Sequence, residues 1–250
     1  MIKLSVNINK IALLRNQRDI GIPDVPESAR TVIDAGAYGV TVHPRPDERH
    51  IRYSDVYEIK ELLKKHPEIE FNIEGNPFTG RYMDIVCEIK PDQATLVPDM
   101  PGAVTSDHGW DLTGQEKKLG PVIDKLKNEN VRISLFMDPV KEQIKTAKEF
   151  GADRVELYTE PYATAFRLNN NLDDVLNHYV EAGAYARDIG LGLNAGHDLN
   201  LKNLPKFCST VHGLMEVSIG HALIADALNM GLSEAVKAYL NVISENELNE

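Results

Sequence analysis

Short apolar runs and stretches with helical spacing alternate along the whole chain. The runs are rich in Val, Ile and Leu, which is typical of strands that are buried on both faces. The strand candidates are residues 4–8, 39–43, 70–74, 93–97, 131–136, 154–158, 191–195 and 215–219. The segments between them place apolar residues on one helical face, most clearly over residues 26–36, 54–67, 140–152, 172–190 and 221–231.

Strand and helix repeated eight times in one 250-residue chain predict a TIM (β/α)₈ barrel. A further short helix is predicted over residues 9–19, between the first strand and the first barrel helix. A doubly wound open sheet is the competing architecture, but the sequence contains neither GxGxxG nor GxxxxGK[ST]. No linker or change of composition divides the chain, so we expect a single domain over residues 1–250, with a frayed tail over 244–250.

Composition narrows the choice of partners. The net charge of −11 argues against a general nucleic-acid or anionic-membrane binder, because such partners require a basic surface. No apolar run approaches the ~20 residues of a membrane helix, and MIKLSVNINK is too polar for a signal peptide. Cys87 and Cys208 form no CxxC motif and are expected to be reduced thiols in a cytoplasmic protein.

Polar residues collect at the carboxyl ends of the predicted strands, where the active sites of such barrels lie. These residues are Asn7, Asn9, Lys10, His43, Arg45, Glu74, Glu156, Asn194, His197, Gly220 and His221. Glu74 ends the apolar strand FNIE, where an unpaired carboxylate is costly. It is either an acid–base group or the partner of Arg45 in a structural ion pair.

Two groups of residues predict anion sites. The turns NAGH and SIGHA follow the last two strands, and the second leads into the helix predicted over 221–231, whose N-terminus favours phosphate. Arg15 and Arg18 after the first strand, and Arg45, Arg49 and His50 after the second, form a second basic cluster. Two anion sites beside two histidines and a glutamate indicate chemistry on phosphorylated small molecules.

The segment 98–112 is long for a connection between a strand and a helix. It contains the only Trp of the chain, two prolines and two glycines. Loops of this kind often close over a substrate and exclude water, although a variable surface loop has the same composition.

Several segments resemble the pyridoxine 5′-phosphate synthase family of the deoxyxylulose-dependent vitamin B6 route. They are VNINKIALLRNQR, GVTVHPRPDERHI, FNIE, TLVPD, SLFMD, VELYTEPYA, LNAGHDLN and SIGHALI, and they cover essentially the whole chain. The resemblance implies condensation of 3-amino-2-oxopropyl phosphate with 1-deoxy-D-xylulose 5-phosphate, which yields pyridoxine 5′-phosphate, inorganic phosphate and water. It implies no metal, no organic cofactor and a homo-octamer of barrels built from dimers.

The same resemblance implies roles for individual residues. His43, Glu74 and His197 would be the acid–base groups. Asn7 and Arg18 would hold the aminoketone phosphate, with phosphate cradled by the amides of Gly220 and His221. The remaining residues implied at the mouth are Asn9, Lys10, Arg45, His50, Thr105, Glu156 and Asp198, of which Arg45, His50 and Thr105 would contact the deoxyxylulose phosphate. The chain departs from the common Asp-His of the family at Asn9-Lys10, and Asp198 stands where some relatives have Gly.

Three other functions remain open at this point. A Schiff-base aldolase acting on a phosphorylated sugar would need a lysine at a strand end, and Lys10 is the candidate. A metal-dependent hydrolase could use His43, Glu74, His197 and His221, but the sequence lacks HxH, HExxH and Asp-rich clusters. A non-catalytic phosphate-binding barrel would use the anion sites alone.

Overall fold

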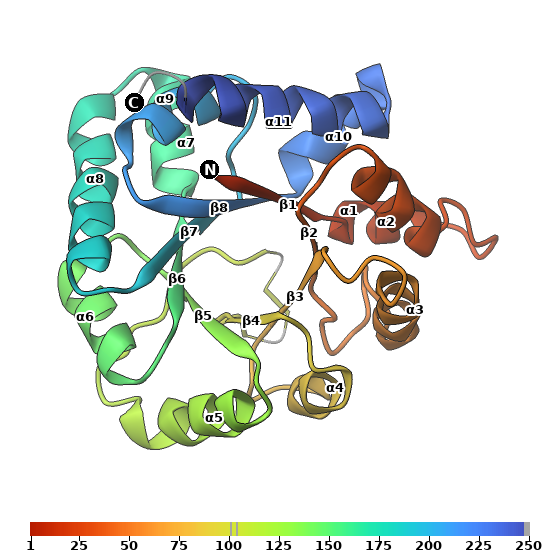
Figure 1. The fold of residues 1–250 in the computed structure, drawn as a ribbon, viewed down its shortest axis with the longest axis horizontal. Coiled ribbons are helices and arrows are strands. Elements are labelled where there is room, and N and C mark those ends of the chain that lie inside the picture. Colours follow the sequence, from red (N-terminus) through yellow and green to blue (C-terminus); the bar gives the residue numbers. More distant parts are fainter. Residues whose placement is uncertain (101, 104, 248–250) are drawn as a thin grey trace.

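The eight strands form a closed barrel in which all neighbours are parallel (Figure 1). The structure is a computed structural model that describes residues 1–100, 102–103 and 105–247. The strands are β1 (Lys3–Asn7), β2 (Gly39–Val42), β3 (Glu70–Gly75), β4 (Gln93–Leu96), β5 (Arg132–Met137), β6 (Arg154–Tyr158), β7 (Gly192–Gly196) and β8 (Leu214–Ile219). The predicted (β/α)₈ barrel is confirmed, and each strand boundary lies within one residue of its prediction.

Helices surround the barrel on all sides (Figure 1). Those that connect successive strands or close the ring are α2 (Val25–Asp34), α3 (Tyr53–Leu63), α4 (Tyr82–Ile89), α5 (Glu116–Asn128), α6 (Lys141–Glu149), α8 (Leu172–Asp188), α9 (Leu204–Thr210) and α11 (Leu232–Glu247). Three more helices follow β1, β6 and β8, namely α1 (Asn9–Arg15), α7 (Glu160–Leu168) and α10 (His221–Met230). None of the helices in the described part of the chain combines the length and the apolar character needed to cross a membrane.

The helix predicted after the first strand is confirmed as α1, although it ends at Arg15 and not at residue 19. Helix α7 was not among the predicted helices; Pro161 lies in its first turn, where a missing N–H costs nothing. The prediction that residues 244–250 fray is wrong for 244–247, because α11 continues to Glu247 after the buried Ile243. Residues 248–250 lie outside the described part.

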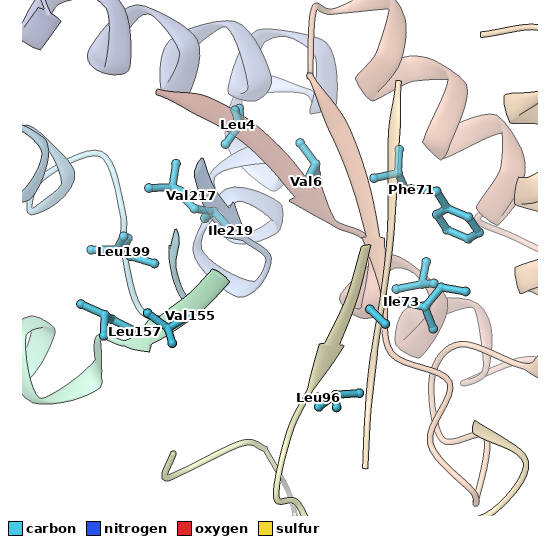
Figure 2. Packing of buried hydrophobic residues seen from close by; sticks show 14 of the residues in the cluster. Leu4, Val6, Phe71, Ile73, Leu96, Val155, Leu157, Leu199, Val217 and Ile219 are labelled. Carbon is cyan, nitrogen blue, oxygen red and sulfur yellow. The ribbon is translucent and has the colours of Figure 1, made fainter. Parts of the chain in front are cut away.

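The apolar core lies between the barrel and its helices. Residues that point outward from the strands, such as Leu4 and Val6 of β1, are fully buried. Figure 2 shows Phe71 and Ile73 projecting from β3 toward the surrounding helices. Burying each such side chain contributes about 1.5–3 kcal/mol, so this shell supplies most of the stability of the barrel.

The inward face of the barrel is polar, which the apolar runs did not predict. Ser5 and Thr41 share a hydrogen bond of 2.7 Å, and Thr95 donates to Asn72 Oδ1 over 3.0 Å. Nearer the amino ends of the strands, two ion pairs with buried carboxylates form a lower ionic layer, defined as Glu70–Arg132 (2.5 Å) and Glu216–Arg154 (3.1 Å). The interior therefore carries polar side chains from its lower end to its mouth.

Candidate active site

A cavity of about 340 Å³ lies at the carboxyl ends of the strands. It is lined by Asn7, Asn9, Lys10, His43, Arg45, His50, Glu74, Thr105, Ser106, Tyr158, Glu160, His197, Asp198, Ser218, Gly220 and His221. Every residue to which the family resemblance assigns a role is in this lining except Arg18 and Glu156. The further candidates Arg15, Arg49 and Asn194 also lie outside it.

His43 and Glu74 face each other in the cavity from neighbouring strands. His43 follows β2 directly and Glu74 is in β3, and their nearest atoms, Nδ1 and Oε2, are 3.8 Å apart. Asn7 donates a hydrogen bond of 3.3 Å to the same Oε2. Glu74 Oε1 has no hydrogen-bond partner within the described residues, which leaves one lone-pair-bearing oxygen free for a ligand.

Burial makes this pair neutral. Loss of hydration, followed by the charge of Asp99, raises the pKa of Glu74 from its ordinary 4.5 to about 8. Burial and then the positive charge of Arg45 lower the pKa of His43 well below 6.5. At neutral pH the pair is therefore a protonated carboxyl beside an uncharged imidazole, which suits proton donation by one and acceptance by the other.

His197 and Glu156 form a second carboxyl–imidazole contact. Their Nδ1 and Oε1 atoms are 3.7 Å apart, and neither these atoms nor Glu156 Oε2 has a hydrogen-bond partner in the part of the chain that the structure describes. Burial and the charge of Glu74 raise the pKa of Glu156 well above 4.5, while burial lowers the pKa of His197 to about 4. Both shifts favour the uncharged forms of the two groups.

The turn that carries His197 is held in an unusual backbone conformation. A Cβ at position 196 would lie 2.2 Å from Glu156 Oε1, so only Gly196 lets this carboxyl lie against the end of β7. His197 itself has a φ of 80°, which is rare for a residue with a side chain and costs on the order of 1 kcal/mol. Its ring packs against Phe136, with the ring centroids 4.6 Å apart.

Arg45 does not form the structural ion pair with Glu74 that the sequence left open. Its guanidinium makes a very short ion pair with Asp99 and donates to the carbonyl of Ala103 over 2.6 Å. Glu74 therefore lines the cavity without a cation in hydrogen-bond contact among the described residues.

His50 is fixed in one tautomer. Its Nδ1 accepts a hydrogen bond of 2.9 Å from the backbone N–H of Ile51, so the ring proton resides on Nε2 in the neutral form. Burial and the charge of Arg45 lower the pKa of His50 to about 4. His50 thus offers the cavity a neutral N–H donor.

The remaining arginines of the predicted basic cluster do not line the cavity at the strand ends. Arg15 donates to both carboxylate oxygens of the buried Asp55, at 2.8 and 2.7 Å, and so has a structural role. Arg49 bonds to Asp47 and to the Ala103 carbonyl, and lines a smaller cavity of about 60 Å³ beside Arg45. Arg18 is exposed on the turn after α1, so its predicted phosphate contact remains a prediction.

The predicted departures from the family pattern also face the cavity. Asn9 Oδ1 accepts a hydrogen bond of 2.9 Å from the backbone N–H of His43, which fixes the end of β2 relative to α1. Lys10 and Asp198 line the same cavity, and burial raises the pKa of Asp198 above its ordinary value.

Sequence reasoning missed several residues of this site. Ser106, Tyr158, Glu160 and Ser218 line the cavity, and Asp99 holds Arg45. Tyr158 and Ser218 belong to inward positions of their strands, so alternation within RVELY and MEVSI contained the signal. Asp99 follows β4 closely, but the segment 98–112 was interpreted only as a loop. No group of three or more His, Cys, Asp or Glu side chains in the described residues is arranged to hold a metal ion.

Comparison with known proteins adds a family to this geometry. A family model described as "Pyridoxal phosphate biosynthesis protein PdxJ" matches residues 4–245. A protein named pyridoxine 5′-phosphate synthase from Christiangramia forsetii is 50% identical over 97% of this chain and 100% of its own length. One of the same name from Albidiferax ferrireducens is also 50% identical, over 97% of this chain and 98% of its own length.

Solved structures share only the fold. KGPDC from Streptococcus mutans matches with a TM-score of 0.64 at 12% identity, over 98% of both chains. Tryptophan synthase from M. tuberculosis matches with a TM-score of 0.64 at 10% identity, over 97% of this chain and 92% of that one.

Proposed function

Because the chain belongs to the family of the pyridoxal phosphate biosynthesis protein PdxJ, we propose that it is a pyridoxine 5′-phosphate synthase. It joins 3-amino-2-oxopropyl phosphate to 1-deoxy-D-xylulose 5-phosphate and releases pyridoxine 5′-phosphate, inorganic phosphate and water. The observation that supports this most directly is the contact of the buried Glu74 carboxyl with the His43 imidazole, 3.8 Å apart, in one cavity with His197.

Forming a pyridine ring from an amine and a ketone requires repeated proton transfers on one bound molecule. Glu74 gives a proton to an oxygen that leaves as water, because a carboxyl with a pKa of about 8 is both protonated and acidic enough near neutrality. His43 removes a proton from the neighbouring carbon or nitrogen and can return it to Glu74, 3.8 Å away. The two groups thereby exchange roles from one step to the next.

His197 serves the opposite side of the same cavity. As a neutral imidazole it accepts a proton from the substrate, and the positive charge that it gains lies 3.7 Å from the carboxyl oxygen of Glu156. The Phe136 ring at its back keeps water from that face, which protects an imine from hydrolysis.

The sugar phosphate is assigned to the side of Arg45 and His50. Arg45 supplies a positive charge and His50 a neutral Nε2–H donor, so the pair can hold a dianion without His50 being charged. Thr105 approaches from the loop after β4 and completes this side. We assign Asn9 and Lys10 to the same phosphate side and Asp198 to substrate binding, since all three line the cavity.

The aminoketone phosphate is assigned to the N-terminus of α10. Gly220 precedes this ten-residue helix without a side-chain cap, and both Gly220 and His221 line the cavity. Free N–H groups and the helix dipole there favour an anion. Asn7 lies beside Gly220, and Arg18 would have to reach this phosphate from an exposed position.

The decisive experiment combines the purified protein with both phosphates in metal-free buffer. We expect a new pyridine chromophore and one inorganic phosphate released per ring formed. Chelation should leave the rate unchanged, since neither metal nor organic cofactor is part of the proposal. Absence of both products would leave only a barrel with anion sites.

We also propose a cytoplasmic homo-octamer built from dimers. The exposed apolar residues Leu228 (78% exposed) and Met230 (42%) near the end of α10 support burial against another subunit. Light scattering coupled to size exclusion tests this; a monomer at micromolar concentration would overturn it.

A further inference from the structure

Asp99 is a buried carboxylate at the carboxyl end of β4, only 6% exposed. Its Oδ2 accepts from the Arg45 guanidinium and from Ser106 Oγ, the latter over 2.7 Å. Its backbone carbonyl accepts a 3.0 Å bond from Asn76 Nδ2, which fixes the residue to the loop after β3. Asp99 therefore connects three segments that are distant in sequence.

The loop after β4 is held at both ends. Near its start, Asp99 bonds to Ser106, and the Ala103 carbonyl accepts from Arg45 and Arg49. At its far end, Gly109 packs so closely on the end of β5 that a Cβ would lie 2.2 Å from Asp138 N. Trp110 Nε1 donates to the Leu96 carbonyl over 2.9 Å. The contacts near the start of the loop thus involve the charged Asp99, whereas those at its far end, through Gly109 and Trp110, are neutral.

Asp99 also acts on Glu74 through its charge. The charged or titratable groups around Glu74 are His43, Arg45, Tyr82, Asp99 and Glu156. The negative charge of Asp99 raises the pKa of Glu74 and the positive charge of Arg45 lowers it. Because Asp99 pairs with Arg45, the two charges compensate each other next to the acid.

We propose that Asp99 is a positioning residue of the reaction: it fixes Arg45 and the loop residue Ser106 at the cavity wall and offsets the charge of Arg45 next to Glu74. This inference rests on the function proposed above. Without Asp99, an unbalanced guanidinium would favour the ionised form of Glu74, and a proton donor would be lost while phosphate attraction remained.

The test uses the full chain with Asp99→Asn, which is nearly isosteric and removes the charge. If the pKa of Glu74 falls to one unit below the working pH, the protonated fraction of its carboxyl drops about tenfold, and we expect kcat to fall by about that factor. The alkaline limb of the pH–rate profile should move to lower pH, and the KM for the sugar phosphate should rise by a few-fold at most, because Arg45 and Ser106 lose their carboxylate partner. If Asp99 merely tied down the loop, KM would rise and the limb would stay in place, which would overturn the proposal.

Two matched variants separate charge from anchoring. Ser106→Ala removes the bond between the loop and Asp99 but keeps the carboxylate, so KM should rise a few-fold with the limb unmoved. Asp107→Asn removes an exposed carboxylate from the same loop and should leave both quantities unchanged. A limb shift in either variant would contradict the assignment to Asp99.

One measurement needs no turnover. Titration of ¹³C-labelled glutamate carboxyls, with Glu74→Gln to assign the signal, gives the midpoint of Glu74 directly. The titration midpoint of Glu74 should fall in Asp99→Asn. If the amide of that variant prevents correct folding, Asp99→Ser should show the same fall. An unchanged midpoint would overturn this inference alone, whereas the absence of pyridine formation by the parent protein would overturn the proposed function.

Discussion

The upper and lower ends of the barrel interior both contain buried carboxyls, but the side chains that contact these carboxyls differ between the two ends. In the lower ionic layer, Glu70 and Glu216 contact the guanidinium groups of Arg132 and Arg154. At the mouth, Glu74 and Glu156 contact imidazoles at 3.8 and 3.7 Å. Among these four described carboxyls, only the two of the lower ionic layer therefore have an arginine at hydrogen-bond distance.

The difference separates charge compensation from proton exchange. A buried carboxylate beside an arginine can stay ionised because the two charges compensate each other. A buried carboxyl beside a neutral imidazole stays protonated and can give up its proton when a ligand demands it. Glu216 departs from this division, because burial and the neighbouring Glu70 raise its pKa to about 8, as for Glu74, despite its contact with Arg154.

The sharpest way to break this comparison is Glu74→Gln. We expect kcat to fall ~10²–10⁴-fold while both phosphates still bind, because the amide keeps the shape but cannot exchange a proton. Rapid-quench kinetics and calorimetric binding measure the two effects. Weakened phosphate binding in the variant, with no pyridine formed by either the parent or the variant, would favour the non-catalytic barrel.

A stability measurement tests whether this variant is folded. Folding raises the pKa of Glu74 from 4.5 to about 8. The contribution of Glu74 to the free energy of unfolding is therefore fully present below pH 4.5 and is progressively lost as the pH rises toward 8. Glutamine does not titrate, so the variant loses no stability through this position in that pH range. The Tm of Glu74→Gln relative to the parent should therefore increase between pH 5 and 8 and then level off.

Arg154→Met tests the lower layer. It leaves Glu216 without its guanidinium partner, and we expect the free energy of unfolding to fall by ~3 kcal/mol. The kcat of the folded fraction should change little, because Arg154 is outside the cavity. Denaturant unfolding and active-site titration check both. Lost activity with unchanged stability would place the lower layer in the chemistry.

The pH–rate profile reports the titration of two cavity residues, Glu74 and His197. Activity that needs protonated Glu74 falls about tenfold per unit above pH ~8, and activity that needs neutral His197 falls likewise below pH ~4. We therefore expect a plateau in kcat/KM between these limbs. An alkaline limb that persists in the residual activity of Glu74→Gln would assign it to another group.

The smallest effect is expected from Lys10→Arg. Lys10 lines the cavity, so a Schiff-base aldolase could use it. Arginine retains the charge but forms no imine, and in the proposed reaction kcat/KM should stay within about threefold of the parent. Borohydride reduction in the presence of a phosphorylated ketone should give no adduct by mass spectrometry; trapping at Lys10 together with inactivity of the variant would favour the aldolase.

Prediction from the sequence succeeded where the signal was local. Strand boundaries were found within one residue because apolar runs end at polar residues, and strand ends identified His43, Glu74 and His197 as neighbours in a mouth. It failed where the partner was distant: Arg45 and Asp99 are 54 residues apart, and no spacing rule relates them. Arg15, assigned to an anion site, instead binds Asp55.

The sequence by itself determined the alternation of strand and helix, the outward apolar shell and the set of polar residues at the strand ends. Those properties follow from side-chain periodicity along a single strand or helix. Only the tertiary structure decided that burial raises the pKa of the strand-end carboxyls Glu74 and Glu156. Those shifts depend on burial and on the nearest charge, and closing the barrel brings Asp99 to Arg45 and leaves Glu74 facing His43.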